Sequence, residues 1–166
     1  MIPYDPDGVQ KQLFITRLHN GTTFDMNVDG SVTEQVFSIA PPVGKIWRVS
    51  KWMLTIQDEK GFSVEGFGAI TQLTNGIEPR IKLGGVVNNL LPFSVKSNGD
   101  IGSVGYPTQI HTWGNTDDML TSEIDFTSIG QFIRLDGDVG DELQVAVKDD
   151  LTALSHFYIQ AQGYIE

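Results

Sequence analysis

The sequence contains no cysteine, so neither a disulfide framework nor a thiolate metal site can form. It has no apolar run long enough to cross a bilayer. Its first residues, "MIPYDPDGVQKQ", lack the basic and apolar regions of a signal peptide. We therefore expect a soluble protein that is made in the cytoplasm and does not bind a membrane.

Basic residues are also scarce, with 11 Lys and Arg against 21 Asp and Glu and a net charge of −10. This balance argues against nucleic-acid binding, which needs a basic face. The charge is uneven, because the segment 115–150 holds ten acidic residues and two basic ones, a local −8. This acidic segment is either a solvated rim or a docking surface for a basic partner.

Helical periodicity is nearly absent, whereas alternation of apolar and polar residues between glycines and prolines recurs along the chain. A length of 166 residues suits one domain, which we expect at 12–166 after an N-terminal arm at 1–11. The arm either reaches a neighbouring molecule or is a frayed end. Strands are predicted at 13–19, 32–39, 45–58, 68–74, 78–84, 92–97, 108–113, 122–128, 131–136, 142–149 and 153–165.

These strands predict an all-β fold, an antiparallel β-sandwich in which each strand has one buried and one wet face. In "ELQVAVK" the residues Leu143, Val145 and Val147 share the core face, and Phe157, Ile159 and Ala161 do so in the last strand. The polar connection "DDLTAL" predicts that these two strands form an antiparallel hairpin. An eleven-strand closed barrel is the alternative.

The stretch from Lys45 to Asp58 changes phase, because Trp47 and Val49 are odd-numbered and Trp52, Leu54 and Ile56 even-numbered. A β-bulge near Ser50 and Lys51 would return all five to one face, and the resulting bend would let the strand serve both sheets. The alternative is a flat strand with one tryptophan exposed at an interface.

Residues for catalysis or metal binding are not clustered in the sequence. His19, His111 and His156 lie on separate predicted strands, without the paired histidines of a cupin-type metal site. The run "LDGDVGDEL" breaks the spacing of an EF-hand loop and is better explained by a tight turn. No "GxSxG" elbow occurs, although a dispersed triad remains an alternative. We therefore predict no enzyme activity, catalytic residue, cofactor or metal.

Three segments carry a resemblance: "APPVGKIWRVSKWMLTIQD", "FGAITQLTNGI" and "GDELQVAVKDDLTALSHFYIQAQGY". Their turns and strands, over 38–77 and 138–164, resemble small virion structural proteins of tailed bacteriophages, of the capsid decoration or cement type. The resemblance implies a β-sandwich of jelly-roll type. It also implies a homo-oligomer, most often a trimer, that binds the major capsid protein or another virion protein on the capsid surface.

A decoration protein of this kind would work by surface contact, and aromatic anchors and charged rims are candidates for it. For the tryptophans the alternative is plain core packing. A tail- or fibre-associated module that binds a glycan receptor through the loop Tyr106 to Asp118 is the second hypothesis, and a cupin-like enzyme is the third. The predicted interface residues are Tyr4, Trp47, Trp52, Trp113, Asp117, Asp118, Asp136 and Asp138.

Overall fold

The computed structural model describes residues 12–18, 26–57, 74–90, 109–114, 119–127, 130–154 and 156–166. In these ranges the regular elements are strands, which confirms the predicted all-β class. No helix in them has the length and apolar character needed to span a bilayer. The strands are β1 (Gln12–Leu18), β2 (Met26–Asp29), β3 (Gln35–Ile39), β4 (Ile46–Gln57), β5 (Ile77–Leu83), β6 (Val86–Asn89), β7 (Gln109–Gly114), β8 (Met119–Asp125), β9 (Ile133–Asp136), β10 (Glu142–Val147), β11 (Asp150–Leu154) and β12 (His156–Ile165).

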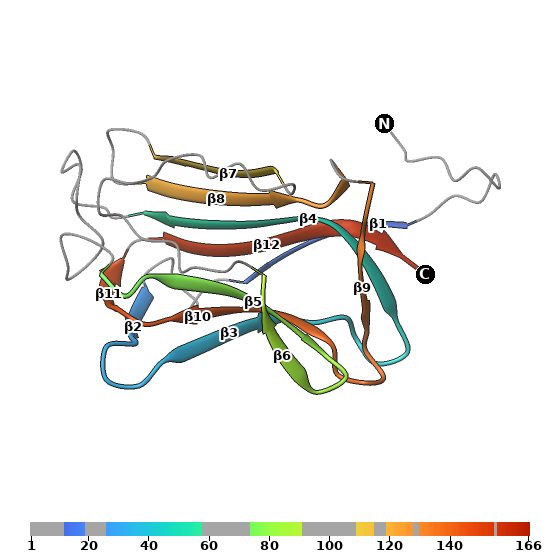
Figure 1. Ribbon diagram of the computed structural model, residues 1–166, viewed down its shortest axis with the longest axis horizontal. Helices are drawn as coiled ribbons and strands as arrows, with labels where there is room; N and C mark the ends of the chain where they lie inside the picture. Colours follow the sequence, from blue (N-terminus) through green and yellow to red (C-terminus); the bar gives the residue numbers. More distant parts are fainter. Residues whose placement is uncertain are drawn as a thin grey trace.

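The strands pair antiparallel into two main sheets that lie face to face (Figure 1). One sheet has the order β1-β12-β4-β8-β7, with β9 also paired to β4, and the other has the order β3-β10-β5-β6. A third, two-stranded sheet joins β11 to β2. This arrangement confirms the antiparallel sandwich, and the described strands do not close into one barrel.

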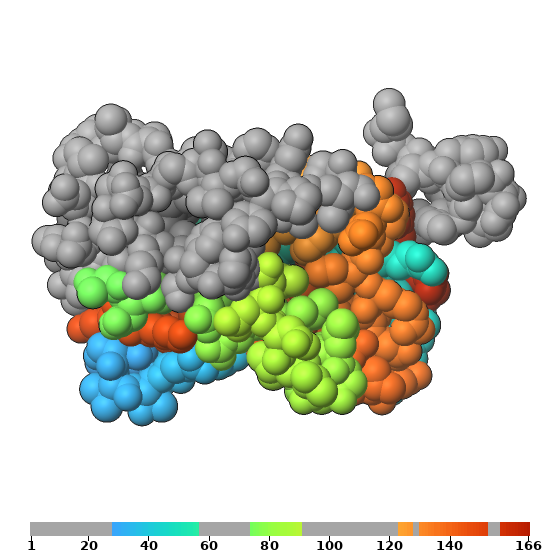
Figure 2. All heavy atoms as spheres, in the orientation of Figure 1, coloured from blue at the N-terminus to red at the C-terminus, as the bar shows by residue number. Residues whose placement is uncertain are grey.

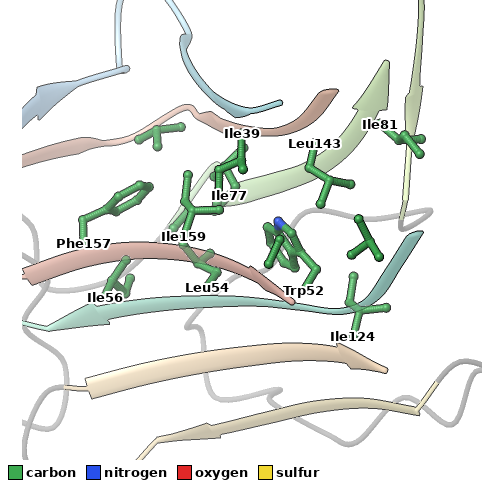
Figure 3. Packing of buried hydrophobic residues seen from close by; sticks show 14 of the residues in the cluster. Ile39, Trp52, Leu54, Ile56, Ile77, Ile81, Ile124, Leu143, Phe157 and Ile159 are labelled. Carbon is green, nitrogen blue, oxygen red and sulfur yellow. The ribbon is translucent and has the colours of Figure 1, made fainter. Parts of the chain in front are cut away.

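The hydrophobic core fills the space between the two main sheets (Figure 3). Alternate residues of β4 and β12 point toward alternate residues of β5 and β10, as the period of two predicts. Phe37 of β3 and Phe157 of β12 meet across this space with ring centroids 5.4 Å apart. The largest fully buried side chains are Trp52, Phe157, Leu54, Ile56, Ile77, Ile124, Leu135, Leu143 and Leu151.

The predicted β-bulge lies in β4. Along the pairing with β12, Gln162 lies opposite Lys51 and Gly163 lies opposite Val49, so Ser50 is the extra residue. Ser50 Oγ donates a hydrogen bond to the carbonyl oxygen of Gln162 at 3.0 Å. The bulge returns five residues to the core face with 0 to 7% of each exposed, namely Trp47, Val49, Trp52, Leu54 and Ile56. The flat strand with an exposed tryptophan is therefore wrong.

The bulge also changes the neighbour of β4. Residues 51–57 of β4 pair with β8, whereas residues 46–49 pair with β9. Because β4 pairs with β12 on both sides of the bulge, it stays within one sheet. The expectation that this bend lets one strand serve both sheets is wrong, since at the bend β4 exchanges its neighbour β8 for β9 within the same sheet.

The predicted hairpin between the last two long strands is also wrong. β10 pairs with β3 and β5 in one sheet, and β12 pairs with β1 and β4 in the other. The connection "DDLTAL" contains β11, which pairs with β2. The physical reason is that the core faces of the two strands are buried against each other across the sandwich, rather than side by side in one sheet.

Short polar strands were not predicted. β2 and β6 have four residues each and read "MNVD" and "VVNN", without a clear alternation. The strands predicted at 68–74 and 92–97 lie outside the described residues, apart from residue 74, which is not in a strand.

Candidate interaction surface

Three turns meet at one end of the sandwich, at residues 42–45, 83–86 and 136–141, and we call this end the three-turn surface. It lies at the lower right of Figure 1. The amide of Gly44 donates to Asp138 Oδ1 at 2.7 Å, and the amide of Gly137 donates to the carbonyl of Lys45 at 3.0 Å. The amide of Gly84 donates to Asp141 Oδ1 at 2.7 Å. These bonds join all three turns.

Asp141 is the buried residue at the centre of these contacts, with 5% of its surface exposed. Its second oxygen, Oδ2, accepts the amide of Asp136 at 3.0 Å, and its own amide donates to the carbonyl of Asp136 at 3.1 Å. One carboxylate therefore closes the turn at 136–141 and fixes it to the β5–β6 turn. A buried carboxylate is stable only when donors surround it in this way.

Glycines make the tight turns possible. Gly84 and Gly85 have φ angles of 55° and 83°, which is the left-handed pair that a two-residue hairpin turn requires. Gly137 is needed for a different reason, because a Cβ atom there would lie 2.1 Å from the carbonyl oxygen of Pro42. The turn at 136–141 can thus pack directly on the turn at 42–45.

The three-turn surface exposes apolar side chains. Figure 2 shows the yellow-green surface of the β5–β6 hairpin beside the orange surface of the β9–β10 segment. Exposed apolar side chains that gather in one patch mark a candidate interaction site, whereas singly exposed ones are normal on a protein surface. Four of the eight exposed large hydrophobic residues in the described ranges lie here, namely Val43 (84% exposed), Leu83 (39%), Val86 (62%) and Val139 (58%), and Val87 (47%) follows directly in β6.

The structure places two predicted interface residues in this surface, Asp136 and Asp138. Their carboxylates shape the turns: Asp136 Oδ1 accepts the amide of Asp138 at 3.0 Å, and Asp138 Oδ1 accepts the amide of Gly44. Asp136 also pairs with Arg134 at 3.1 Å. These two carboxylates therefore hold the surface in shape, and their contact with a partner remains a prediction.

Trp47 and Trp52 are buried, so the prediction that one of them forms an interface is wrong. The bulge turns both rings into the core. Trp113 lies in β7, and its side chain is outside the described part of the chain, as are Tyr4, Asp117 and Asp118.

The acidic segment uses its charges mainly inside the chain. All eight of its acids in the described ranges have a partner in the same molecule. Six accept backbone amides and two form ion pairs, Glu123 with Lys51 and Glu142 with Lys82. The six are Asp125, Asp136, Asp138, Asp141, Asp149 and Asp150. Aspartates suit this role because their side chains reach amides a few residues away. The predicted tight turn in "LDGDVGDEL" is confirmed.

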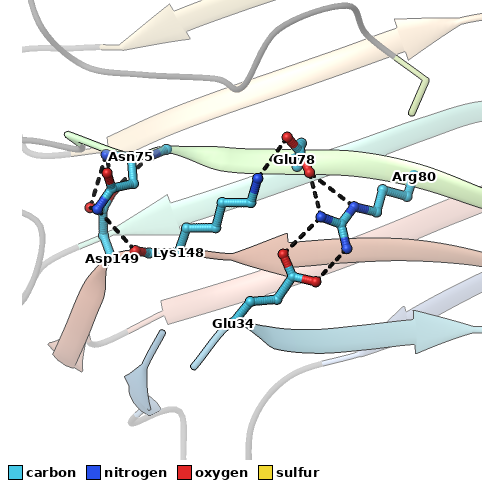
Figure 4. Close-up of polar contacts among 7 residues, drawn as sticks. Glu34, Asn75, Glu78, Arg80, Lys148 and Asp149 are labelled. Carbon is cyan, nitrogen blue, oxygen red and sulfur yellow. Dashed lines mark hydrogen bonds and ion pairs between the residues drawn. The ribbon is translucent and has the colours of Figure 1, made fainter. Parts of the chain in front are cut away.

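The outer face of the second sheet carries a chain of ion pairs (Figure 4). Arg80 binds Glu34 with two hydrogen bonds of 2.6 and 2.8 Å and binds Glu78 at 2.5 Å, while Lys148 binds Glu78 at 2.8 Å. Beneath them Ala146 of β10 is fully buried, although its side chain points to this outer face opposite Glu78. The ion pairs thus cover the centre of the face.

These contacts shift the ionisation of the groups. The hydrogen bond from Arg80 lowers the pKa of Glu34. For Glu78 burial acts in the opposite direction, but hydrogen bonds from Lys148 and Arg80 outweigh it and lower the pKa. The hydrogen bond to Glu34 raises the pKa of Arg80. Each of these three shifts favours the charged form of its group, so the ion pairs of this face are a structural element.

The sequence contains a signal for the three-turn surface that strand alternation does not reveal. Each turn places a valine directly beside a glycine, in "VG" at 43–44, "GGV" at 84–86 and "VG" at 139–140. In the described ranges no group of three or more His, Cys, Asp or Glu residues could hold a metal ion. Comparisons of the chain with protein-family models, curated proteins and solved structures find no match.

Proposed function

We propose that this chain is a non-enzymatic structural protein of a bacteriophage virion, which decorates the capsid by seating the three-turn surface on the major capsid protein. The observation that carries the proposal is the set of four exposed apolar residues on turns that Asp141 and Asp138 hold together. Such a surface can bury apolar area on contact at a low entropic cost, because the turns are already ordered.

The order of the strands supports the jelly-roll fold that the resemblance implies. Eight strands in chain order are β1, β3, β4, β5, β6, β8, β10 and β12. The sheets then read first-eighth-third-sixth and second-seventh-fourth-fifth. A jelly roll, which folds eight strands into two Greek keys, has this order.

The proposal includes a homo-oligomer, with a trimer favoured, in which several copies of the three-turn surface engage the shell together. Linked contacts must break together, so modest contacts from each subunit add to a large effect on shell stability. The expected location is the outer surface of the capsid.

The test is to measure the mass of the purified protein by light scattering, mix it with undecorated capsids and pellet them. We expect a trimer that co-sediments near stoichiometric occupancy. The double variant Val86→Ser and Val139→Ser should lose most of this binding. Val32→Ser is the matched control, because Val32 is 91% exposed but lies on the turn between β2 and β3.

Two results would overturn the proposal: wild-type protein that stays in the supernatant, or equal binding by the double variant and the control. The alternative, a tail- or fibre-associated module that binds a glycan receptor, would then be tested on a glycan array. Its predicted loop, Tyr106 to Asp118, contains strand β7 at Gln109–Gly114, and the rest of it lies outside the described residues.

A further inference from the structure

The buried carboxylate of Asp149 accepts hydrogen bonds from the backbone amides of both Asn75 and Gly76 (Figure 4). Asp149 is 4% exposed, and its Oδ2 accepts the amide of Gly76 at 2.7 Å. The amide of Asn75 lies 3.0 and 3.1 Å from the two carboxylate oxygens. The side-chain nitrogen Nδ2 of Asn75 donates to Asp149 Oδ1 at 3.1 Å and to the carbonyl of Lys148 at 3.2 Å.

An asparagine followed by glycine can deamidate without a catalyst, because glycine has no side chain to hinder ring closure. The amide nitrogen of Gly76 would lose its proton and attack Cγ of Asn75. A carbon–nitrogen bond forms, and the side-chain nitrogen leaves as ammonia. Water then opens the succinimide ring to aspartate or isoaspartate.

The contacts of Asp149 oppose each part of this reaction. Loss of the proton from Gly76 would break a hydrogen bond to a carboxylate and place one anion beside another. Ring closure also requires the side chain of Asn75 to turn toward Gly76, which breaks both bonds of Nδ2. The folded turn therefore slows both the attack by the amide nitrogen of Gly76 and the loss of the side-chain nitrogen of Asn75.

We propose that Asn75 is a deamidation site that Asp149 keeps closed in the folded protein and that reacts when this turn opens. After the reaction the turn cannot close again with its original hydrogen bonds. An aspartate or isoaspartate at position 75 has no Nδ2 to donate, and its carboxylate would face that of Asp149. Because the turn leads directly into β5, the modified chain would hold the start of this strand less firmly.

The test follows deamidation by peptide mapping with mass spectrometry in wild-type protein and in Asp149→Asn, at mildly alkaline pH. The variant keeps one acceptor oxygen but loses the charge. We expect deamidation at Asn75 to rise by about tenfold to a hundredfold, which corresponds to about 1.4 to 2.7 kcal/mol at 1.36 kcal/mol per decade of rate. The other two Asn-Gly pairs, Asn20–Gly21 and Asn98–Gly99, report in the same digest whether the change is local.

Asp141→Asn is the matched control, because it removes the charge of another buried carboxylate, one that does not contact Asn75. It should leave the rate at Asn75 unchanged. An equal rate at Asn75 in Asp149→Asn and wild type would overturn the proposal. If Asp149→Asn does not fold, the comparison of folded with urea-unfolded wild-type protein decides. A rate at Asn75 at least about tenfold lower in the folded chain supports protection, and equal rates refute it.

Discussion

Replacement of Asp141 by alanine tests whether one buried carboxylate holds the three-turn surface together. The change removes two hydrogen bonds from backbone amides, those of Gly84 at 2.7 Å and Asp136 at 3.0 Å. A hydrogen bond to a charged group contributes about 1.5 to 3 kcal/mol net. Because water can reach the turns once the carboxylate is gone, we expect the lower end for each bond, a loss of about 3 kcal/mol in the free energy of unfolding.

The assay is urea unfolding, in which a lower midpoint at constant slope reports lost stability. The thermal midpoint should fall by roughly 6 to 12 °C for a chain of this size. The matched control is Asp138→Ala, which removes one exposed bond to Gly44 and should cost about 1 kcal/mol or less. Equal midpoints for the two variants would refute the reasoning, since burial of the carboxylate would then have no consequence.

Two further predictions concern the bulge and the ion pairs. Gly163→Ala places a Cβ atom 1.9 Å from the carbonyl oxygen of Arg48, so the strands must separate, and urea unfolding should show a loss of about 3 kcal/mol. An unchanged midpoint would mean that β12 shifts freely. Acid should also weaken the fold. The hydrogen bond from Arg80 lowers the pKa of Glu34. Burial acts to raise the pKa values of Glu78 and Glu142, but hydrogen bonds, from Lys148 and Lys82 among others, outweigh it and bring both below 4.5. As the pH falls, the unfolded chain therefore takes up protons before the folded chain does. The contribution of the three glutamates to the free energy of unfolding is complete above pH 4.5 and is lost as the pH falls through their lower pKa values in the folded protein. Urea midpoints measured against pH should fall in this window, and less steeply in Glu78→Gln. An identical slope in that variant would contradict the assignment.

The positions of most long strands could be predicted from the sequence, because alternation along a strand reports which side chains are buried. The phase change between Val49 and Trp52 predicted a bulge near Ser50 and Lys51, since an extra residue returns both sets of side chains to one face, and the structure places it at Ser50. The strands β2 and β6 were missed because short segments without a clear alternation form strands only through their partners, and β11 was missed because "DDLTAL" was interpreted as a hairpin connection.

The candidate surface was harder to predict than the fold. Asp136 and Asp138 were selected for their charge and do lie in the three-turn surface, but their carboxylates bind neighbouring amides. The exposed valines were not selected, because a single apolar residue in a turn gives no periodic signal. Trp47 and Trp52 were predicted as candidate anchors because aromatic side chains bury a large area, but their burial depends on the bulge, which was only one of two alternatives.

The sequence by itself determined the all-β class and the core faces of β10 and β12, and it predicted the bulge in β4 as one of two alternatives. These properties depend on the order of neighbouring residues, and the pleat of a strand converts that order directly into burial. Only the tertiary structure decided that β10 and β12 lie in opposite sheets, that three turns meet at one end, and where two aspartates are buried. Asp141 meets Gly84 across 57 positions and Asp149 meets Asn75 across 74. Such contacts follow from how the two sheets pack, which no local pattern encodes.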